Sequence, residues 1–115
     1  MCALDISNSW FLNNFAGYEG GAIKWNYYEP TMNLDFNKNF KNNSALVYGN
    51  NIASVAKFLN VTVQNNSTSK SVRLLQVSEV VVQSGGDFNV TLALFDKYNN
   101  IITTDSSSKL YVSTV

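Results

Sequence analysis

Two six-residue stretches decide the fold of this chain: Phe11–Ala16, which reads FLNNFA, and Phe40–Ala45, which reads FKNNSA. They start 29 residues apart, and Ile23 aligns with Ile52 at the same offset. A repeat at a fixed offset predicts that equivalent residues take equivalent places in two copies of one structural unit.

The repeat continues upstream, where residues 4–7 (LDIS) match residues 34–37 (LDFN) at an offset of 30. One unit of 29 or 30 residues thus accounts for most of residues 4–54. Helical repeats of this length need amphipathic stretches of about ten residues. The segment from Phe11 to Ile23 has no apolar stripe at helical spacing, so short strands separated by Asn and Gly fit better.

A unit of this length can wrap three short strands and three turns into one coil. Successive coils would stack at the strand spacing of about 4.8 Å, with equivalent residues above one another. Stacked apolar residues would form columns inside the coils, and stacked Asn side chains would form an amide ladder. Glycines would supply the backbone freedom that the corners need. We expect these roles for the pairs Phe11–Phe40, Ile23–Ile52, Asn14–Asn43 and Gly20–Gly49.

The first copy resembles a known family in two motifs. FLNN at residues 11–14 followed by GGAI at residues 20–23 resembles the FxxN and GGAI signatures of polymorphic outer-membrane protein repeats. The second copy reads FKNN at 40–43 and GNNI at 49–52, with Asn in place of Gly and Ala. The resemblance covers residues 4–54 and implies a right-handed parallel β-helix of an adhesive cell-surface protein.

After residue 71 the pattern changes to strands of period two. Residues 72–77, 80–82, 88–95, 101–104 and 110–112 are expected strands, and SGGD at residues 84–87 is a turn signal. Residues 96–100 are expected to form a hairpin connection. Strands separated by turns every 8–12 residues favour a β-sandwich. Residues 88–101 are similar to the strand–"D-x-Y-G-N"–strand core of immunoglobulin-like domains in adhesins and filamins, with Asn99 in place of the glycine.

The sequence therefore predicts an all-β fold in three segments. Residues 1–56 are expected to be the C-terminal coils of a right-handed parallel β-helix, residues 57–71 a transition and linker, and residues 72–115 a partial immunoglobulin-like β-sandwich. A complete sandwich needs about 100 residues, so we expect the chain to be a fragment of a longer protein. The alternative is one compact all-β domain without stacked coils.

The composition excludes several classes of partner and site. The formal net charge is zero, with eight basic and eight acidic residues, and there is no histidine. Nucleic acid and anionic membranes need a concentrated basic surface, which this chain lacks. Cys2 is the one cysteine, so no internal disulfide or cysteine-rich metal site can form. The first residues lack the features of a signal peptide, and no apolar run is long enough to span a membrane.

Trp25, Tyr28 and Glu19 are the candidates for carbohydrate contact. In a strand, Trp25 and Tyr27 would share the inner side and Tyr28 would point outward. Glycosidic cleavage needs two carboxylates across one bond, whereas Tyr48 stands where the second copy would match Glu19. We therefore expect Glu19 to be a turn charge rather than a catalytic acid.

Two further patterns concern ions and glycans. Asp87, Asp96 and Asp105 recur every nine residues near expected turns, a weak pattern for calcium, and we expect no metal and no cofactor. Five asparagines fit the N-glycosylation sequon, which would be used only in a secreted chain. These sequons are Asn42, Asn60, Asn65, Asn66 and Asn89.

The expected function is a non-catalytic structural or adhesive segment of a larger cell-surface or secreted repeat protein. Its partners would be other segments of that protein, surface glycans or another cell-surface protein, with no nucleic acid and no membrane contact. The alternative is a carbohydrate-binding or polysaccharide-cleaving β-helix of the pectin-lyase type. That alternative requires Trp25, Tyr28 and Glu19 to converge in a groove.

Overall fold

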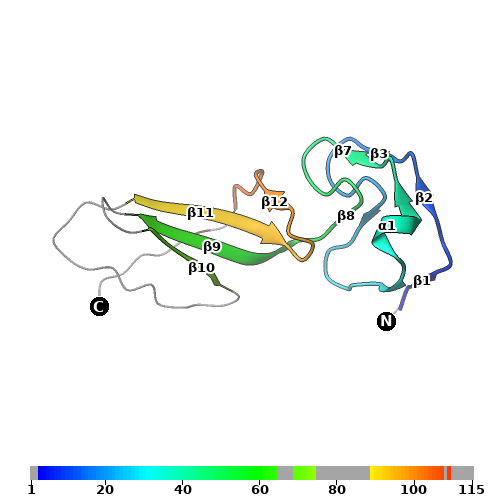
Figure 1. The fold of residues 1–115 in the computed structure, drawn as a ribbon, viewed down its shortest axis with the longest axis horizontal. Coiled ribbons are helices and arrows are strands. Elements are labelled where there is room, and N and C mark those ends of the chain that lie inside the picture. The colour runs from blue at the N-terminus through cyan, green and yellow to red at the C-terminus, as the bar shows by residue number, and fades with distance from the viewer. Residues whose placement is uncertain (1–2, 65–68, 75–88, 108, 110–115) are drawn as a thin grey trace.

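The computed structural model describes residues 3–64, 69–74, 89–107 and 109. Strands dominate these residues, which confirms the all-β prediction. In Figure 1 stacked coils of chain form one part and an antiparallel sheet forms the other. Within the described residues the one helix is the four-residue α1 (Phe36–Asn39), and no helix there is long and apolar enough to cross a membrane.

Two coils of chain, residues 5–25 and residues 31–53, lie one on the other. The first coil holds β1 (Asp5–Ser7), β2 (Phe11–Leu12), β3 (Phe15–Ala16) and β4 (Ile23–Lys24); the second holds β5 (Thr31–Asn33), β6 (Phe40–Lys41), β7 (Ser44–Ala45) and β8 (Ile52–Ala53). Each strand of the first coil pairs in parallel with its counterpart in the second. Sheets of two short strands do not by themselves establish a parallel β-helix.

The register from β2 onward follows the 29-residue offset of the sequence. Phe11 pairs with Phe40 and Ile23 pairs with Ile52. The two phenyl rings stack with centroids 5.1 Å apart and planes 10° from parallel. Phe40 and Ile52 are buried with Trp25 in the core cluster, and Phe11 and Ile23 pack against it. The predicted apolar columns are therefore confirmed.

The Asn43 carboxamide bridges the coils at the predicted ladder position. Its Oδ1 accepts from the backbone N–H and from Nδ2 of Asn14, both at 3.0 Å. Its Nδ2 donates to the Phe11 carbonyl at 2.9 Å and to Asn51 Oδ1 at 3.1 Å. One buried side chain thus makes four hydrogen bonds, three of which cross between coils.

The corners use residues that tolerate positive φ. Gly20 and Gly49 have φ of +67° and +72°, as predicted, and Asn13 and Asn42 have +55° and +54°. Gly21 is fixed by packing instead, because a Cβ there would overlap the Asn50 carbonyl oxygen of the second coil. The equivalent position in the second coil carries Asn50, which is exposed.

The upstream alignment at an offset of 30 is wrong. β1 pairs with β5, so that Ile6 lies beside Met32 at an offset of 26. The second coil has three more residues than the first between its first two strands, and α1 takes them up. Asp35 caps this turn by accepting from the Asn37 N–H at 2.9 Å, and Asn39 Oδ1 accepts from the Asp35 N–H at 2.8 Å.

The second part is an antiparallel sheet of order β10–β9–β11–β12. Its strands are β9 (Ala56–Gln64), β10 (Ser69–Leu74), β11 (Asn89–Asp96) and β12 (Ile101–Ile102). We expected residues 57–71 to be a transition and linker. Instead residues 57–64 belong to β9 and residues 69–71 belong to β10. The cause is the run of aromatic and β-branched residues in FLNVTV at 58–63, which favours a strand.

The expected hairpin at residues 96–100 is confirmed, because β11 and β12 pair antiparallel across it. Asn99, at the position of the expected glycine, has φ of +61°. The expected strands at 80–82 and 110–112, the turn at 84–87 and Cys2 lie outside the described residues. The division of the chain into a coil domain and a sandwich domain stays a prediction.

Replacing Asn43 with Leu tests the ladder. The substitution keeps the size of the side chain but removes the bonds of the Asn43 carboxamide to the Asn14 N–H and to the Phe11 carbonyl. We expect a loss of about 1–3 kcal/mol of unfolding free energy, seen as a drop of at least about 4 °C in melting temperature. Asn26→Leu is the control, because Asn26 is exposed and makes no hydrogen bond in the described structure. Equal melting temperatures for the two variants would contradict the ladder.

Candidate functional site

The hairpin loop 96–100 docks onto the second coil and joins the two parts of the molecule. Asp96 lies at its centre with 0% exposure. Its carboxylate accepts from the backbone N–H of Ser54 at 3.0 Å, from those of Tyr98 and Asn100 at 2.9 Å, and from Asn100 Nδ2 at 2.9 Å. Asn100 Nδ2 also donates to the Ile52 carbonyl at 3.0 Å. A buried carboxylate with four donors holds the loop and the last strand of the coils as one unit.

Tyr98 of the same loop packs against the aromatic side chains of the coil core. Its hydroxyl accepts from Trp25 Nε1 at 2.8 Å, and the two rings meet edge to face with centroids 6.4 Å apart. Phe36 stacks on Phe40 and lies beside Tyr98, with centroids 5.5 and 6.2 Å apart. Burial raises the pKa of the Tyr98 phenol. The stacked rings of Phe11, Phe40 and Phe36 therefore end at Tyr98, a side chain of the hairpin loop.

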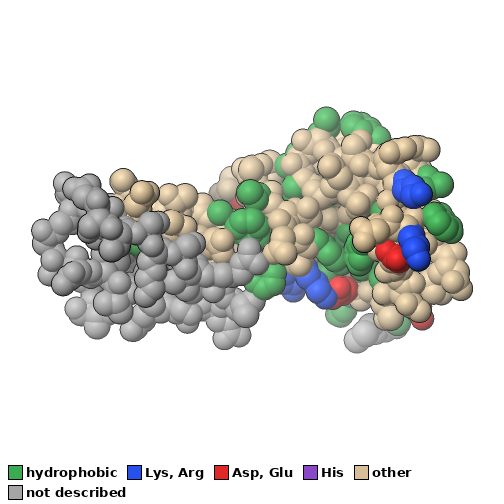
Figure 2. Space-filling view, viewed as in Figure 1, with side chains coloured by type: hydrophobic (Ala, Val, Ile, Leu, Met, Phe, Trp, Pro, Cys, Tyr) green, Lys and Arg blue, Asp and Glu red, His purple; other side chains and the backbone are tan. Residues whose placement is uncertain are grey.

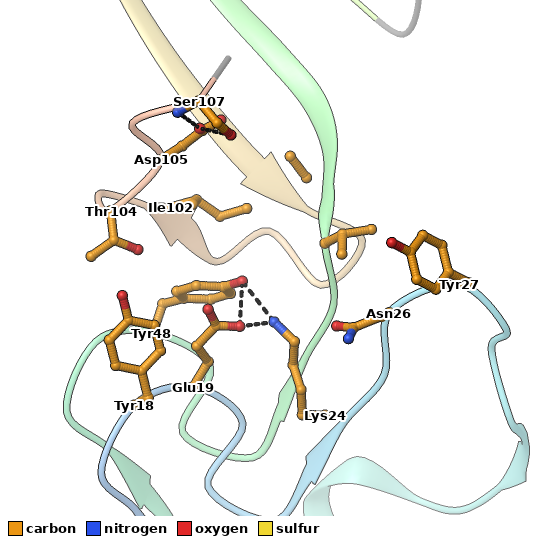
Figure 3. A pocket seen from close by; sticks show the side chains of 12 residues that line it. Tyr18, Glu19, Lys24, Asn26, Tyr27, Tyr48, Ile102, Thr104, Asp105 and Ser107 are labelled. Carbon is orange, nitrogen blue, oxygen red and sulfur yellow. Dashed lines mark hydrogen bonds and ion pairs between the residues drawn. The ribbon is translucent and has the colours of Figure 1, made fainter.

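An open cleft of about 510 Å³ lies beside this joint, between the coils and the segment after β12 (Figure 3). The coils supply Tyr18, Glu19, Lys24, Asn26, Tyr27 and Tyr48. The connection into β9 supplies Val55 and Ala56, and the opposite wall is Ile102, Thr104, Asp105 and Ser107. The cleft thus exists only because the joint places both parts side by side.

Glu19, Lys24 and Tyr48 form one polar network on the floor of the cleft. Glu19 forms an ion pair with Lys24 and accepts from the Tyr48 hydroxyl at 2.9 Å. Lys24 Nζ donates to the Tyr48 hydroxyl at 3.1 Å, which also lies 2.9 Å from the Ser54 carbonyl. Glu19 and Tyr48 are bridge partners between the coils, as the 29-residue offset predicted. Figure 3 shows these three side chains converging.

Burial sets the protonation behaviour of this network. It lowers the pKa of the Lys24 ammonium, an effect that the Asp96 carboxylate partly opposes. It raises the pKa of the Tyr48 phenol, and the charges of Asp96 and Tyr18 act in the same direction. Lys24 Nζ and the Tyr48 hydroxyl bind each other, and Glu19 binds both of them.

The cleft offers hydrogen-bonding groups and aromatic surface. Glu19 is held by Lys24 and Tyr48, and Asp105 accepts from the N–H and the hydroxyl of Ser107 at 2.9 and 3.2 Å. Within the part of the chain that the structure describes, no three His, Cys, Asp or Glu side chains are grouped to hold a metal. Asp96 binds backbone donors, and Asp87 lies outside the described residues.

The three predicted carbohydrate contacts do not share one surface. Trp25 is buried at 8% exposure and bonded to Tyr98, Glu19 lies in the cleft, and Tyr28 is exposed but does not line the cleft. The outward position of Tyr28 was predicted correctly, whereas Tyr27 is 89% exposed rather than inside. β4 ends at Lys24, so strand alternation does not extend to residue 27.

The described sequons lie on different parts of the fold. Asn42 is exposed at a corner of the second coil, and Asn89 is exposed at the start of β11. Asn60 lies within the central strand β9 and is partly buried. Asn65 and Asn66 lie outside the described residues. Glycosylation at any of the five stays a prediction.

Sequence reasoning missed the roles of Asp96, Tyr98 and Asn100 in joining the two parts. The signal was present, since these residues are the D, Y and N of the D-x-Y-G-N pattern. The pattern indicated a hairpin, but nothing in it said which surface the hairpin would meet. Tyr18 and Tyr27 were missed as cleft residues because the opposite wall is remote in sequence.

Comparison of the chain with protein-family models, curated proteins and solved structures found no match.

Asp96→Asn tests the joint. The substitution puts an NH₂ group against N–H donors inside a buried site. We expect a loss of about 2–3 kcal/mol in unfolding free energy, measured by urea denaturation, because the lost bonds are charge-assisted. Asp5→Asn serves as the control, since Asp5 is exposed and makes no side-chain bond in the described structure. A loss of less than about 0.5 kcal/mol would contradict the role of Asp96.

The raised pKa of Tyr48 predicts a pH dependence of stability. The folded state keeps the phenol proton to a higher pH than the unfolded state, so this contribution is complete below pH 10 and is lost as pH rises above it. Urea denaturation at about pH 9 and about pH 11 should show a smaller decrease for Tyr48→Phe than for the original chain. Tyr28→Phe is the control. The same decrease in all three proteins would be inconsistent with this assignment.

Proposed function

We propose that this chain is a non-catalytic structural and adhesive segment of a larger cell-surface or secreted repeat protein. In this proposal the two coils belong to a right-handed parallel β-helix like those of polymorphic outer-membrane proteins. The antiparallel sheet begins an immunoglobulin-like sandwich. One observation carries the proposal: like residues pair with like across the coils at one constant offset, from Phe11–Phe40 to Ile23–Ile52.

Such pairing suits a mechanical role. Each coil contacts its neighbour through parallel backbone bonds, a stacked aromatic pair and an amide ladder. A stack held this way gains stability with each neighbour and forms a stiff rod. The Phe11–Phe40 contact alone is of the kind that contributes about 0.5–1.5 kcal/mol beyond burial of its area.

The two ends of the stack differ. The hairpin loop with Asp96 covers part of the second coil, where Phe36 and Leu46 stay exposed. The first coil exposes several further large apolar side chains. These are Leu4 (62%), Trp10 (60%), Leu12 (46%) and Phe15 (66%). Figure 2 shows apolar side chains at the surface of the coil part. A further coil of the same pattern would cover them, which is why we propose that other segments of the parent protein are partners.

An extracellular location is part of the proposal. The exposed sequons Asn42 and Asn89 are accessible to glycosylation, and a net charge of zero suits contact with neutral glycans or other surface proteins. The low overall charge gives no steering toward nucleic acid.

The alternative of a polysaccharide-cleaving β-helix needs a catalytic carboxylate that can move a proton. Glu19 is the acid in the cleft that comes from the coils, and it is tied to Lys24 and Tyr48. The burial of Trp25 removes one of the three contacts on which that alternative was based. Binding of carbohydrate without cleavage remains compatible with the cleft.

Two assays on the full chain test the proposed function. Incubation with neutral and uronate polysaccharides should release no new reducing ends, for the original chain and for Glu19→Gln alike. Beads coated with the chain should attach to cell surfaces more than beads coated with heat-unfolded chain. Product release that disappears in Glu19→Gln would overturn the non-catalytic proposal, and equal attachment of folded and unfolded chain would overturn the adhesive one.

A further inference from the structure

The cleft at the joint has the features of a small-molecule site. Its volume of about 510 Å³ falls within the range of about 300–1,000 Å³ that is usual for ligand pockets. It lies between two structural parts, where ligand sites are common. Three separate segments of the chain line it, so its shape is specific to the assembled fold.

Two exposed tyrosines stand at its edge. Tyr27 is 89% exposed and Tyr18 is 58% exposed, and both line the cleft. In Figure 3 they lie on opposite sides of the Glu19–Lys24–Tyr48 network. Exposed aromatic rings beside a polar cleft offer flat apolar faces with a hydroxyl at the tip, which suit a ligand with both apolar faces and polar edges.

The polar groups around these rings are mostly neutral. Asn26 provides an amide from the coils, and Thr104 and Ser107 provide hydroxyls from the opposite wall. Groups of this kind both donate and accept, as a ligand that carries many hydroxyls requires. Val55, Ala56 and Ile102 supply the remaining apolar surface.

Charge excludes an anionic ligand. Lys24 is the one cation among the residues that line the cleft, and its ammonium is bound to Glu19 and Tyr48. Phosphates and uronates are recognised by cations with free donors, preferably arginine. Asp105 adds a negative charge on the other wall, which disfavours an anion further.

We propose that this cleft binds a short neutral saccharide, with Tyr18 and Tyr27 packing on the faces of its pyranose rings. Asn26, Thr104 and Ser107 hydrogen-bond its hydroxyls. The inference rests on the proposed adhesive function, because it gives that function a ligand class and a site. It differs from the site expected from the sequence, since Trp25 and Tyr28 take no part.

The test is binding of the full chain to an immobilised panel of neutral trisaccharides: cellotriose, maltotriose and chitotriose. Trigalacturonate and inorganic phosphate are the anionic probes. We expect at least one neutral trisaccharide to bind, with an affinity that does not change with salt, because no ion pair is formed. Failure of every neutral trisaccharide, or salt-sensitive binding of an anionic probe alone, would overturn the proposal.

The variants form a matched set of neighbouring tyrosines. Tyr27→Ala and Tyr18→Ala should each weaken binding about tenfold or more, as loss of an aromatic anchor does. Tyr27→Phe should retain binding, because the ring face is kept. Tyr28→Ala is the control, because Tyr28 is 72% exposed beside the site but does not line it. Similar losses for Tyr27→Ala and Tyr28→Ala would overturn the proposal, and unchanged melting temperatures would show that all variants are folded.

Failure of this inference is distinguishable from failure of the proposed function. If beads coated with Tyr18→Ala and Tyr27→Ala chains attach to cells as the original chain does, the adhesive surface lies elsewhere and the saccharide proposal falls. If the soluble chain binds a trisaccharide but coated beads do not attach, the adhesive function falls and the site stands.

Discussion

The Asn43 carboxamide fixes the register of the two coils, and the rest of the fold depends on that register. It is buried, so its two donors and its acceptor oxygen must all be satisfied within the protein. The first coil satisfies the oxygen and one donor through Asn14 and the Phe11 carbonyl, and Asn51 of the second coil accepts from Nδ2 as well. A slip of one residue would break these bonds and turn Phe40 and Ile52 away from the core. The amide thus selects the register, and the apolar columns pack the core in that register.

A second buried group, the Asp96 carboxylate, couples the coils to the sheet. It binds Ser54 at the end of the coils and closes its own hairpin at the same time. Tyr98 of that hairpin completes the aromatic column by bonding Trp25. The cleft beside the joint is a consequence, because its two walls come from the two parts. Binding at the cleft is therefore sensitive to the joint as well as to the residues that line it.

The contacts between equivalent residues of the two copies could be predicted from the sequence. The contacts between the coils and the later part of the chain could not. The pairing of Phe11 with Phe40, the Asn14–Asn43 ladder and the Gly20 and Gly49 corners follow from one constant offset, because stacking places equivalent residues together. The offset of the first strand failed because the Asp35 turn inserts residues into one coil only.

Less of the candidate site could be predicted from the sequence. Glu19 and its partner Tyr48 were paired correctly by the repeat, but the opposite wall around Thr104 belongs to a different part of the chain. Trp25 was placed on the inner side correctly, yet its bond to Tyr98 depends on the docking of a hairpin far along the sequence. Alternation also ceased to apply once β4 ended, which is why Tyr27 is outside and lines the cleft.

The most direct test of the account is a nuclear Overhauser measurement on the full chain with labelled phenylalanine and isoleucine. Ring centroids 5.1 Å apart predict strong cross-peaks between the Phe11 and Phe40 rings. The parallel pairing of β4 with β8 predicts a further contact between the side chains of Ile23 and Ile52. Absence of both contacts in a folded sample would contradict the stacked coils and the proposals that rest on them.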